Sequence, residues 1–139
     1  MFDENPIETY GYLLKELQHR KIGFVELAES RHEHSYGARV HHSSPAEQIP
    51  RVCQAFRPFF QGLIIGNYGF NGETGLQAIQ DGECDLVSFG RNYISHPDLA
   101  ERVINGIELT NKLDFSTLYW DPKRDKAVGY TDYPYFKKE

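Results

Sequence analysis

Two stretches decide the fold of this chain: residues 63–70, Leu-Ile-Ile-Gly-Asn-Tyr-Gly-Phe, and residues 85–91, Asp-Leu-Val-Ser-Phe-Gly-Arg. Each is a short apolar run that leads into a glycine, which is typical of a buried parallel strand followed by a sharp turn. Between them, Leu76 and Ile79 share one face of a predicted helix over residues 73–80. The order strand, helix, strand, with a connection too long for a hairpin, predicts parallel strands joined by a helical crossover.

The same pattern extends upstream. A helix is predicted over residues 6–19, because Asn5 is a good N-cap and Pro6 suits the first helical position. The short apolar run that follows this helix predicts a first strand. Residues 49–60 have a second helical pattern, which Pro58 should end or distort.

Downstream, Pro97 should start a further helix that ends at Gly106. We expect an irregular tail, pinned by its many aromatic side chains, over residues 107–139. The sequence therefore predicts an α/β fold with three parallel strands, near residues 22–28, 62–66 and 85–89.

Composition excludes several classes of function. The chain has 139 residues and a formal net charge of −5, without a cluster of Lys and Arg, so neither nucleic acid nor an anionic membrane is an expected partner. No stretch approaches the roughly 20 apolar residues of a membrane span, and the amino terminus is acidic, so the expected compartment is the cytoplasm. Cys53 and Cys84 have no metal-binding spacing, and we expect two reduced, buried thiols.

Glycines at the two strand ends suggest a phosphate site. Gly66 and Gly90 would let backbone N–H groups approach an anion, and Arg91 would add a permanently charged donor. A helix that starts near Pro97, or near Gly72 after the first turn, could add its dipole. The alternative is that the glycines only permit tight turns and that Arg91 pairs with a surface carboxylate. From spacing alone, this alternative is the favoured one.

A family resemblance changes that balance. Residues 63–70 and 85–99 resemble the last two barrel strands of the old yellow enzyme family. Residues 116–119 are similar to that family's Thr-Phe-Tyr stretch, and residues 129–134 resemble its characteristic ending. The resemblance implies a partial (β/α)8 TIM barrel, of which this chain has about the last three strand–helix units and the tail. Residues 1–139 would then be the C-terminal portion of a single FMN-binding domain, a fold that normally needs about 250 residues.

The resemblance also implies a site. Gly66 and Asn67 match the family's flavin contacts after the seventh strand, and Gly90 with Arg91 match its FMN-phosphate contacts after the eighth. Tyr119 matches a tyrosine on the substrate side of the flavin; by itself it would be interpreted as an aromatic residue that packs the tail onto the barrel.

The implied activity is that of an FMN-dependent NAD(P)H oxidoreductase, an ene-reductase that reduces the C=C bond of α,β-unsaturated carbonyl compounds and similar electrophilic alkenes. The family's oxygen-binding residues and its tyrosine proton donor lie upstream and have no counterpart here. We therefore assign no catalytic residue, apart from Tyr119 as a substrate-side candidate, and expect this chain alone to be inactive.

Three strands cannot close into a barrel, so two unpaired edges and an apolar face should be exposed. We expect either a chain or segment that supplies the remaining strands, or self-association. The alternative function is a non-catalytic half-barrel that binds phosphate or flavin, or an oligomerisation module.

One loop is rich in histidine, a common metal ligand. It carries His32, His34, His41 and His42. No cysteine or ordered carboxylate pattern accompanies them, so we expect a solvated loop and no metal site.

Overall fold

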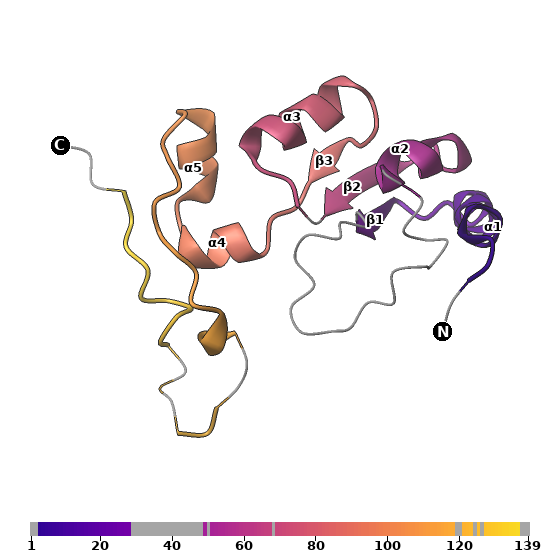
Figure 1. Cartoon of the computed structure of the whole chain (residues 1–139). Helices are drawn as coiled ribbons and strands as arrows, with labels where there is room; N and C mark the ends of the chain where they lie inside the picture. Colours follow the sequence, from indigo (N-terminus) through magenta and orange to yellow (C-terminus); the bar gives the residue numbers. More distant parts are fainter. Residues whose placement is uncertain are drawn as a thin grey trace. The chain divides into compact units, whose positions relative to one another are not determined.

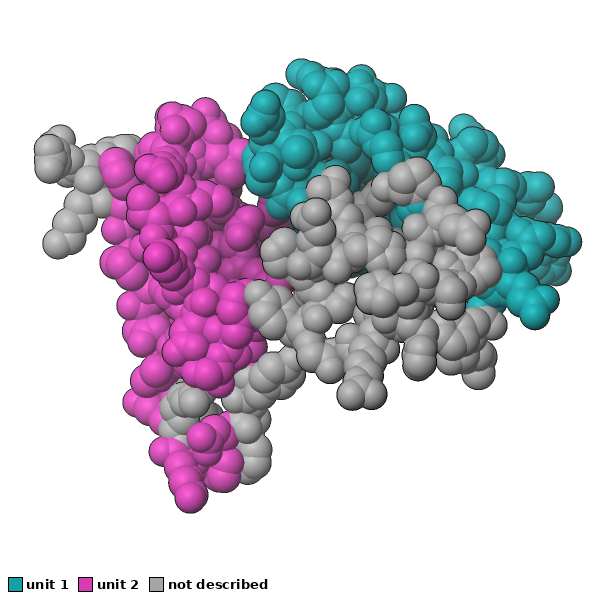
Figure 2. Space-filling model, in the orientation of Figure 1, with its two compact units in different colours: residues 1–88 teal, residues 89–139 magenta. Residues whose placement is uncertain are grey.

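The computed structural model describes residues 3–28, 49, 51–67, 69–118, 121–123, 125 and 127–136. The chain consists of two compact units, residues 1–88 and residues 89–139 (Figure 2). The strands lie in the first unit, and the second contains short helices and the tail.

The first unit is built on a parallel sheet with the strand order β1-β2-β3 (Figure 1). Its strands are β1 (Phe24–Ala28), β2 (Leu63–Asn67) and β3 (Leu86–Val87). The register pairs all five residues of β1 with those of β2, from Phe24 with Leu63 to Ala28 with Asn67. The prediction of an α/β fold with three parallel strands is confirmed, and the carboxyl ends of the strands meet at one edge.

Helices connect and cover these strands. They are α1 (Pro6–His19), α2 (Val52–Phe56), the 3-10 helix η3 (Arg57–Phe59) and α3 (Gly72–Gln80). Asn5 caps α1 by accepting a hydrogen bond from the Glu8 N–H. The helix predicted over residues 49–60 changes to η3 at Arg57, beside Pro58, because proline lacks the N–H that a continuing α-helix would use.

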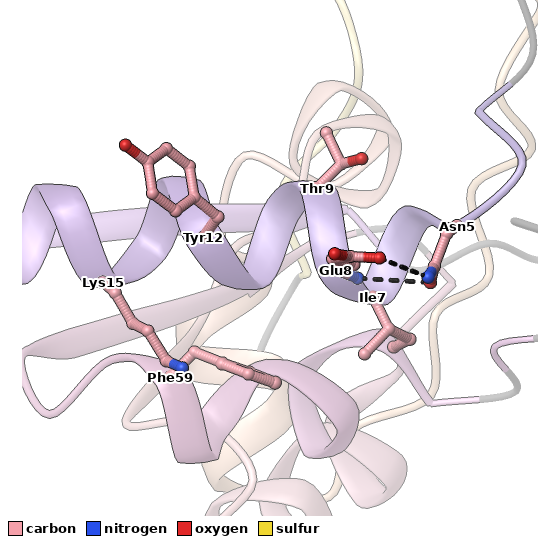
Figure 3. A pocket seen from close by; sticks show the side chains of 7 residues that line it. All are labelled: Asn5, Ile7, Glu8, Thr9, Tyr12, Lys15 and Phe59. Atoms are coloured by element: carbon pink, nitrogen blue, oxygen red, sulfur yellow. Dashed lines mark hydrogen bonds between the residues drawn. The ribbon is translucent and has the colours of Figure 1, made fainter.

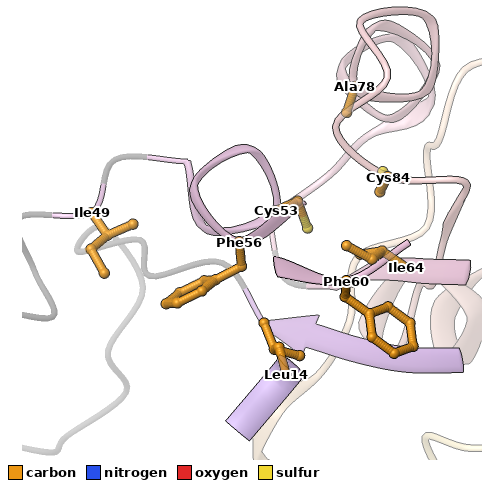
Figure 4. Packing of buried hydrophobic residues seen from close by; sticks show 8 residues of the cluster. All are labelled: Leu14, Ile49, Cys53, Phe56, Phe60, Ile64, Ala78 and Cys84. Carbon is orange, nitrogen blue, oxygen red and sulfur yellow. The ribbon is translucent and has the colours of Figure 1, made fainter. Parts of the chain in front are cut away.

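The core packs the helices against one face of the sheet (Figure 4). Ile64 and Phe60 are fully buried, and Val25, Leu27 and Val87 project from the same face. Cys53 and Cys84 are both buried in this core, as predicted. The buried cluster is formed by Leu14, Ile49, Cys53, Phe56, Phe60, Ile64, Ala78 and Cys84.

The opposite face of the sheet, called here the open face, is apolar at its amino-terminal side. Phe24, Leu63 and Leu86 project from it, and each is at least half exposed among the described residues. Strand residues alternate between the two faces, so this exposure is a property of the whole face and not of one side chain. The predicted exposed apolar face is therefore present in the first unit.

The second unit contains α4 (Arg91–Ser95), α5 (Leu99–Ile104) and the 3-10 helix η4 (Phe115–Thr117). The helix predicted to start at Pro97 begins two residues later, after Asp98. It ends as expected: Gly106 has φ 65°, and the Ile107 N–H donates to Arg102 O at 2.8 Å. Helix α4 was not predicted.

Polar contacts and aromatic side chains together hold the tail. A buried ion pair, with 2.8 Å between Arg102 Nε and Asp98 Oδ1, organises it. Arg102 also donates to Glu108 O at 3.2 Å, and Asp98 Oδ2 accepts from the Phe136 N–H at 2.8 Å. Aromatic side chains contribute, as expected: the Tyr133 hydroxyl accepts from the Asp114 N–H at 2.9 Å, and Arg102 lies over the Phe136 ring.

Candidate functional site

Three polar side chains meet on the open face, at the carboxyl ends of the strands. Asn67 is the last residue of β2, and its Nδ2 donates to Glu26 Oε1 at 2.5 Å. Ser88 directly follows β3, and its Oγ donates to the same oxygen at 2.7 Å. We call Glu26, Asn67 and Ser88 the Glu26 cluster. It joins all three strands of the sheet.

The Glu26 cluster carries a negative charge. The hydrogen bond from Asn67, and then that from Ser88, lowers the pKa of the Glu26 carboxyl, because both favour the ionised form. Sequence reasoning identified Asn67 but missed the other two residues. Glu26 lies 41 positions before Asn67 and 62 positions before Ser88, and no local pattern relates the three residues.

Gly66 lies on the other face of β2 and is buried. A Cβ atom at this position would lie 3.0 Å from Phe70 Cε2 and 3.3 Å from the Sγ atoms of both Cys53 and Cys84. The space that a side chain would need is therefore filled by three segments of the core. Core packing therefore explains why position 66 is a glycine, a reason that the sequence did not reveal. The flavin contact of Gly66 stays a prediction.

Gly90 and Arg91 belong to the second unit. Gly90 is the N-cap of α4, and its carbonyl accepts from the N–H groups of Tyr93 and Ile94 at 3.0 and 3.2 Å. Its φ of −89° is open to any residue, and a Cβ there would meet no atom within 4 Å. The backbone at Gly90 therefore borders open space among the described residues. That an anion binds to Gly66, Gly90 and Arg91 together stays a prediction.

A second polar cluster lies at the opposite end of the strands. Asp85 precedes β3 and accepts from the Ile64 N–H at 2.8 Å and from Arg57 Nη1 at 2.7 Å. The hydrogen bond from Ile64, together with Arg57, lowers the pKa of Asp85 despite its partial burial. Arg57 Nη2 also donates to Phe60 O and Gly62 O, at 2.8 and 2.5 Å. Arg57 is therefore committed to closing the start of β2 and is not a free anion ligand.

In the second unit, His96 is buried and neutral. Burial lowers its pKa, more than the hydrogen bond to Asn92 O raises it. The Asn111 N–H donates to Nε2 at 3.0 Å, so the proton of the neutral ring is on Nδ1, 3.2 Å from Asn92 O. Asn111 Nδ2 also donates to Ser95 O and Pro134 O, at 2.6 and 3.0 Å. His96 thus helps to hold the tail and has no free nitrogen for chemistry.

A shallow groove of about 800 Å³ lies along α1 (Figure 3). Lys15 Nζ is 5.2 Å from the centre of the Phe59 ring at this groove. No strand residue lines it, so we do not assign it to the predicted cofactor. Its lining residues are Asn5, Ile7, Glu8, Thr9, Tyr12, Lys15 and Phe59.

Two predicted features lie outside the described residues: Tyr119, and the histidines at positions 32, 34, 41 and 42. Within the described part of the chain, no three His, Cys, Asp or Glu side chains group as metal ligands. None of its helices is long and apolar enough to cross a membrane.

Comparisons with known proteins find relatives that match nearly the whole chain. No family model matches it. It is 34% identical over 141 residues to 12-oxophytodienoate reductase 7 of Oryza sativa subsp. japonica, covering 96% of this chain and 34% of that protein. It is 32% identical over 138 residues to 12-oxophytodienoate reductase 1 of the same organism, covering 99% of this chain and 33% of that protein.

Solved structures agree. Morphinone reductase superposes with a TM-score of 0.74 at 30% identity, over 96% of this chain and 32% of that one. The old yellow enzyme from Trypanosoma cruzi superposes with a TM-score of 0.76 at 27% identity, over 97% of this chain and 31% of that one. The chain spans about a third of the length of the curated relatives it matches.

Proposed function

This chain belongs to the old yellow enzyme family and corresponds to about a third of that family's barrel, and from this premise we propose that it provides the FMN-phosphate side of an NAD(P)H-dependent ene-reductase. The observation that carries the proposal is the agreement of sequence and fold along nearly the whole chain. Relatives with oxidoreductase names match 96 to 99% of it, and the parallel strands end at Asn67 and just before Ser88.

The proposed cofactor contacts are those that the family resemblance implies. Gly66 and Asn67 contact the flavin after β2, and Gly90 and Arg91 contact the phosphate after β3. The donor set suits a phosphomonoester, because a guanidinium forms two parallel charge-assisted hydrogen bonds to phosphate oxygens. The open space at Gly90 supports this assignment, since an anion could approach the backbone there. When bound, FMN would supply hydride transfer from NAD(P)H to an electron-poor alkene.

The whole activity requires more than this chain contains. We propose that the remaining strands come from another segment or chain, which covers the open face at Phe24, Leu63 and Leu86. That partner would bring the groups that polarise the carbonyl oxygen of an α,β-unsaturated substrate, while Tyr119 of this chain lines the substrate side. This chain alone would then be inactive.

Co-expression with a polypeptide that carries the first five strands of a family barrel tests the proposal. We expect a complex with flavin absorbance and alkene-dependent NAD(P)H oxidation. A complex without either would contradict the proposed function.

Arg91→Ala in that complex tests the phosphate contact. Losing a charge-assisted contact of about 1.5 to 3 kcal/mol should weaken FMN binding about 10- to 150-fold. Riboflavin, which has no phosphate, should bind the variant and the parent equally. Arg20→Ala is the matched control, because Arg20 makes an exposed ion pair with Glu16 on α1. Equal losses for FMN and riboflavin, or no loss for FMN, would refute the assigned role.

The exposed apolar face favours one second candidate, a non-catalytic module that oligomerises through this face. Solution mass and flavin content, measured on the same sample, separate the two functions. A stable flavin-free oligomer that gains no flavin with the partner would support the second candidate.

A further inference from the structure

The Glu26 cluster has a hydrogen-bond pattern that restricts what can bind beside it. Its two donors point to one carboxylate oxygen, Glu26 Oε1, at 2.5 Å from Asn67 and 2.7 Å from Ser88. The single hydroxyl hydrogen of Ser88 is therefore used, and only the lone pairs of that oxygen remain. The bond from Nδ2 of Asn67 fixes the orientation of its amide, so that its carbonyl oxygen is turned away from the carboxylate.

The cluster thus offers mainly acceptors to a ligand. These are the carboxylate of Glu26, the lone pairs of Ser88 and the amide oxygen of Asn67. The second N–H of the Asn67 amide remains as a donor, so a group that both donates and accepts, such as a hydroxyl, suits the cluster.

The negative charge of the Glu26 cluster also disfavours an anionic ligand at this position. None of the ion pairs within the described part of the chain includes Glu26, so the donors share its charge without neutralising it. A phosphate against this carboxylate would place like charges together, which is unfavourable at contact distance. Phosphate binding is therefore better served by the segment that follows, where Arg91 is permanently positive.

The position in the chain fits a ligand with two different ends. Asn67 directly follows Gly66, and Ser88 stands two residues before Gly90. A flavin nucleotide has two such ends, because its ribityl chain, with its hydroxyl groups, joins the ring to the phosphate.

We propose that Glu26 is a positioning residue that orients Asn67 and Ser88 as acceptors for the uncharged hydroxyl groups of the cofactor. The inference rests on the proposed flavin-binding function. It adds a residue and a ligand part that the family resemblance did not assign.

Glu26→Gln is the informative variant, because the amide keeps an oxygen for both donors but removes the charge. Glu73→Gln is the matched control, since it removes the same charge from the exposed surface of α3. In the reconstituted complex, Glu26→Gln should weaken the binding of riboflavin and of FMN by the same factor, about tenfold. The reason is that charge-assisted hydrogen bonds are roughly twice as strong as neutral ones. The control should bind both as the parent does. Tighter FMN binding with unchanged riboflavin binding would overturn the proposal, since the carboxylate would then face the phosphate; unchanged binding of both would also overturn it.

A second measurement does not depend on flavin. In the full 139-residue chain without cofactor, the side-chain amide resonances of Asn67 should shift in Glu26→Gln and stay unchanged in Glu73→Gln. Unchanged Asn67 resonances in Glu26→Gln would refute the positioning role, whatever the complex binds. If those resonances shift but the parent complex binds no flavin, the proposed function and the ligand part of this inference both fail, and the positioning role alone is supported.

Discussion

Replacing Gly66 by alanine should destabilise the first unit through its core. The new methyl carbon would lie 3.0 Å from Phe70 Cε2, closer than the roughly 3.5 Å at which carbon atoms attract each other. Two sulfur atoms at 3.3 Å, of which that of Cys53 is fully buried, leave little room on the other sides. Inserting a methyl group into such a core costs about 1 to 3 kcal/mol, which raises the unfolding constant about 5- to 150-fold.

Urea unfolding followed by circular dichroism measures this free energy. Gly23→Ala is the control, because a Cβ at Gly23 would meet no atom within 4 Å. It should change the stability by less than about 0.5 kcal/mol. Phe70→Leu removes the closest atom, so Gly66→Ala and Phe70→Leu together should be less destabilising than the sum of the two, by at least about 0.5 kcal/mol.

Equal stabilities of Gly66→Ala and Gly23→Ala would refute the packing argument. If FMN binding were lost in the complex while the stability stayed unchanged, the glycine would be required for the approach of the cofactor instead. The experiment therefore separates the two reasons for a glycine at this position.

Two further predictions concern the second unit and one turn. Gly129→Ala should loosen the tail, because its φ of 78° costs a side chain about 1 to 3 kcal/mol and its Cβ would overlap Thr117. The control is Gly82→Ala, since Gly82 has a similar φ of 72° but open space around its Cβ position. Faster limited proteolysis of the tail in Gly129→Ala than in Gly82→Ala would show the overlap, and equal rates would exclude it. Burial lowers the pKa of His96, so on acidification the unfolded state takes up the proton at a higher pH than the folded state does. The free energy of unfolding should therefore have its full value above the ordinary histidine pKa of about 6.5 and fall as the pH drops below it. Urea unfolding midpoints measured across this pH range should lose their pH dependence in His96→Gln. They should keep it in His19→Gln, because His19 is exposed. The same pH dependence in both variants would contradict the role of His96.

Local sequence patterns predicted the elements that have a strong local signal. The three strands are short apolar runs, and α1 starts at the expected Asn5 cap, so neighbouring residues alone specify them. The family resemblance was carried by ordered motifs and is confirmed by relatives that match 96 to 99% of the chain. Helix α4 was missed because five residues give too short a period to recognise.

The sequence by itself determined the fold class, the family and the places where the strands end. Only the tertiary structure decided what surrounds those ends. The joining of Glu26 to Asn67 and Ser88, and the crowding of Gly66 by two thiols and a ring, follow from strand register and helix packing. Each depends on which face a residue takes and on contacts with distant segments, and a one-residue shift of register would remove them while leaving every local pattern unchanged.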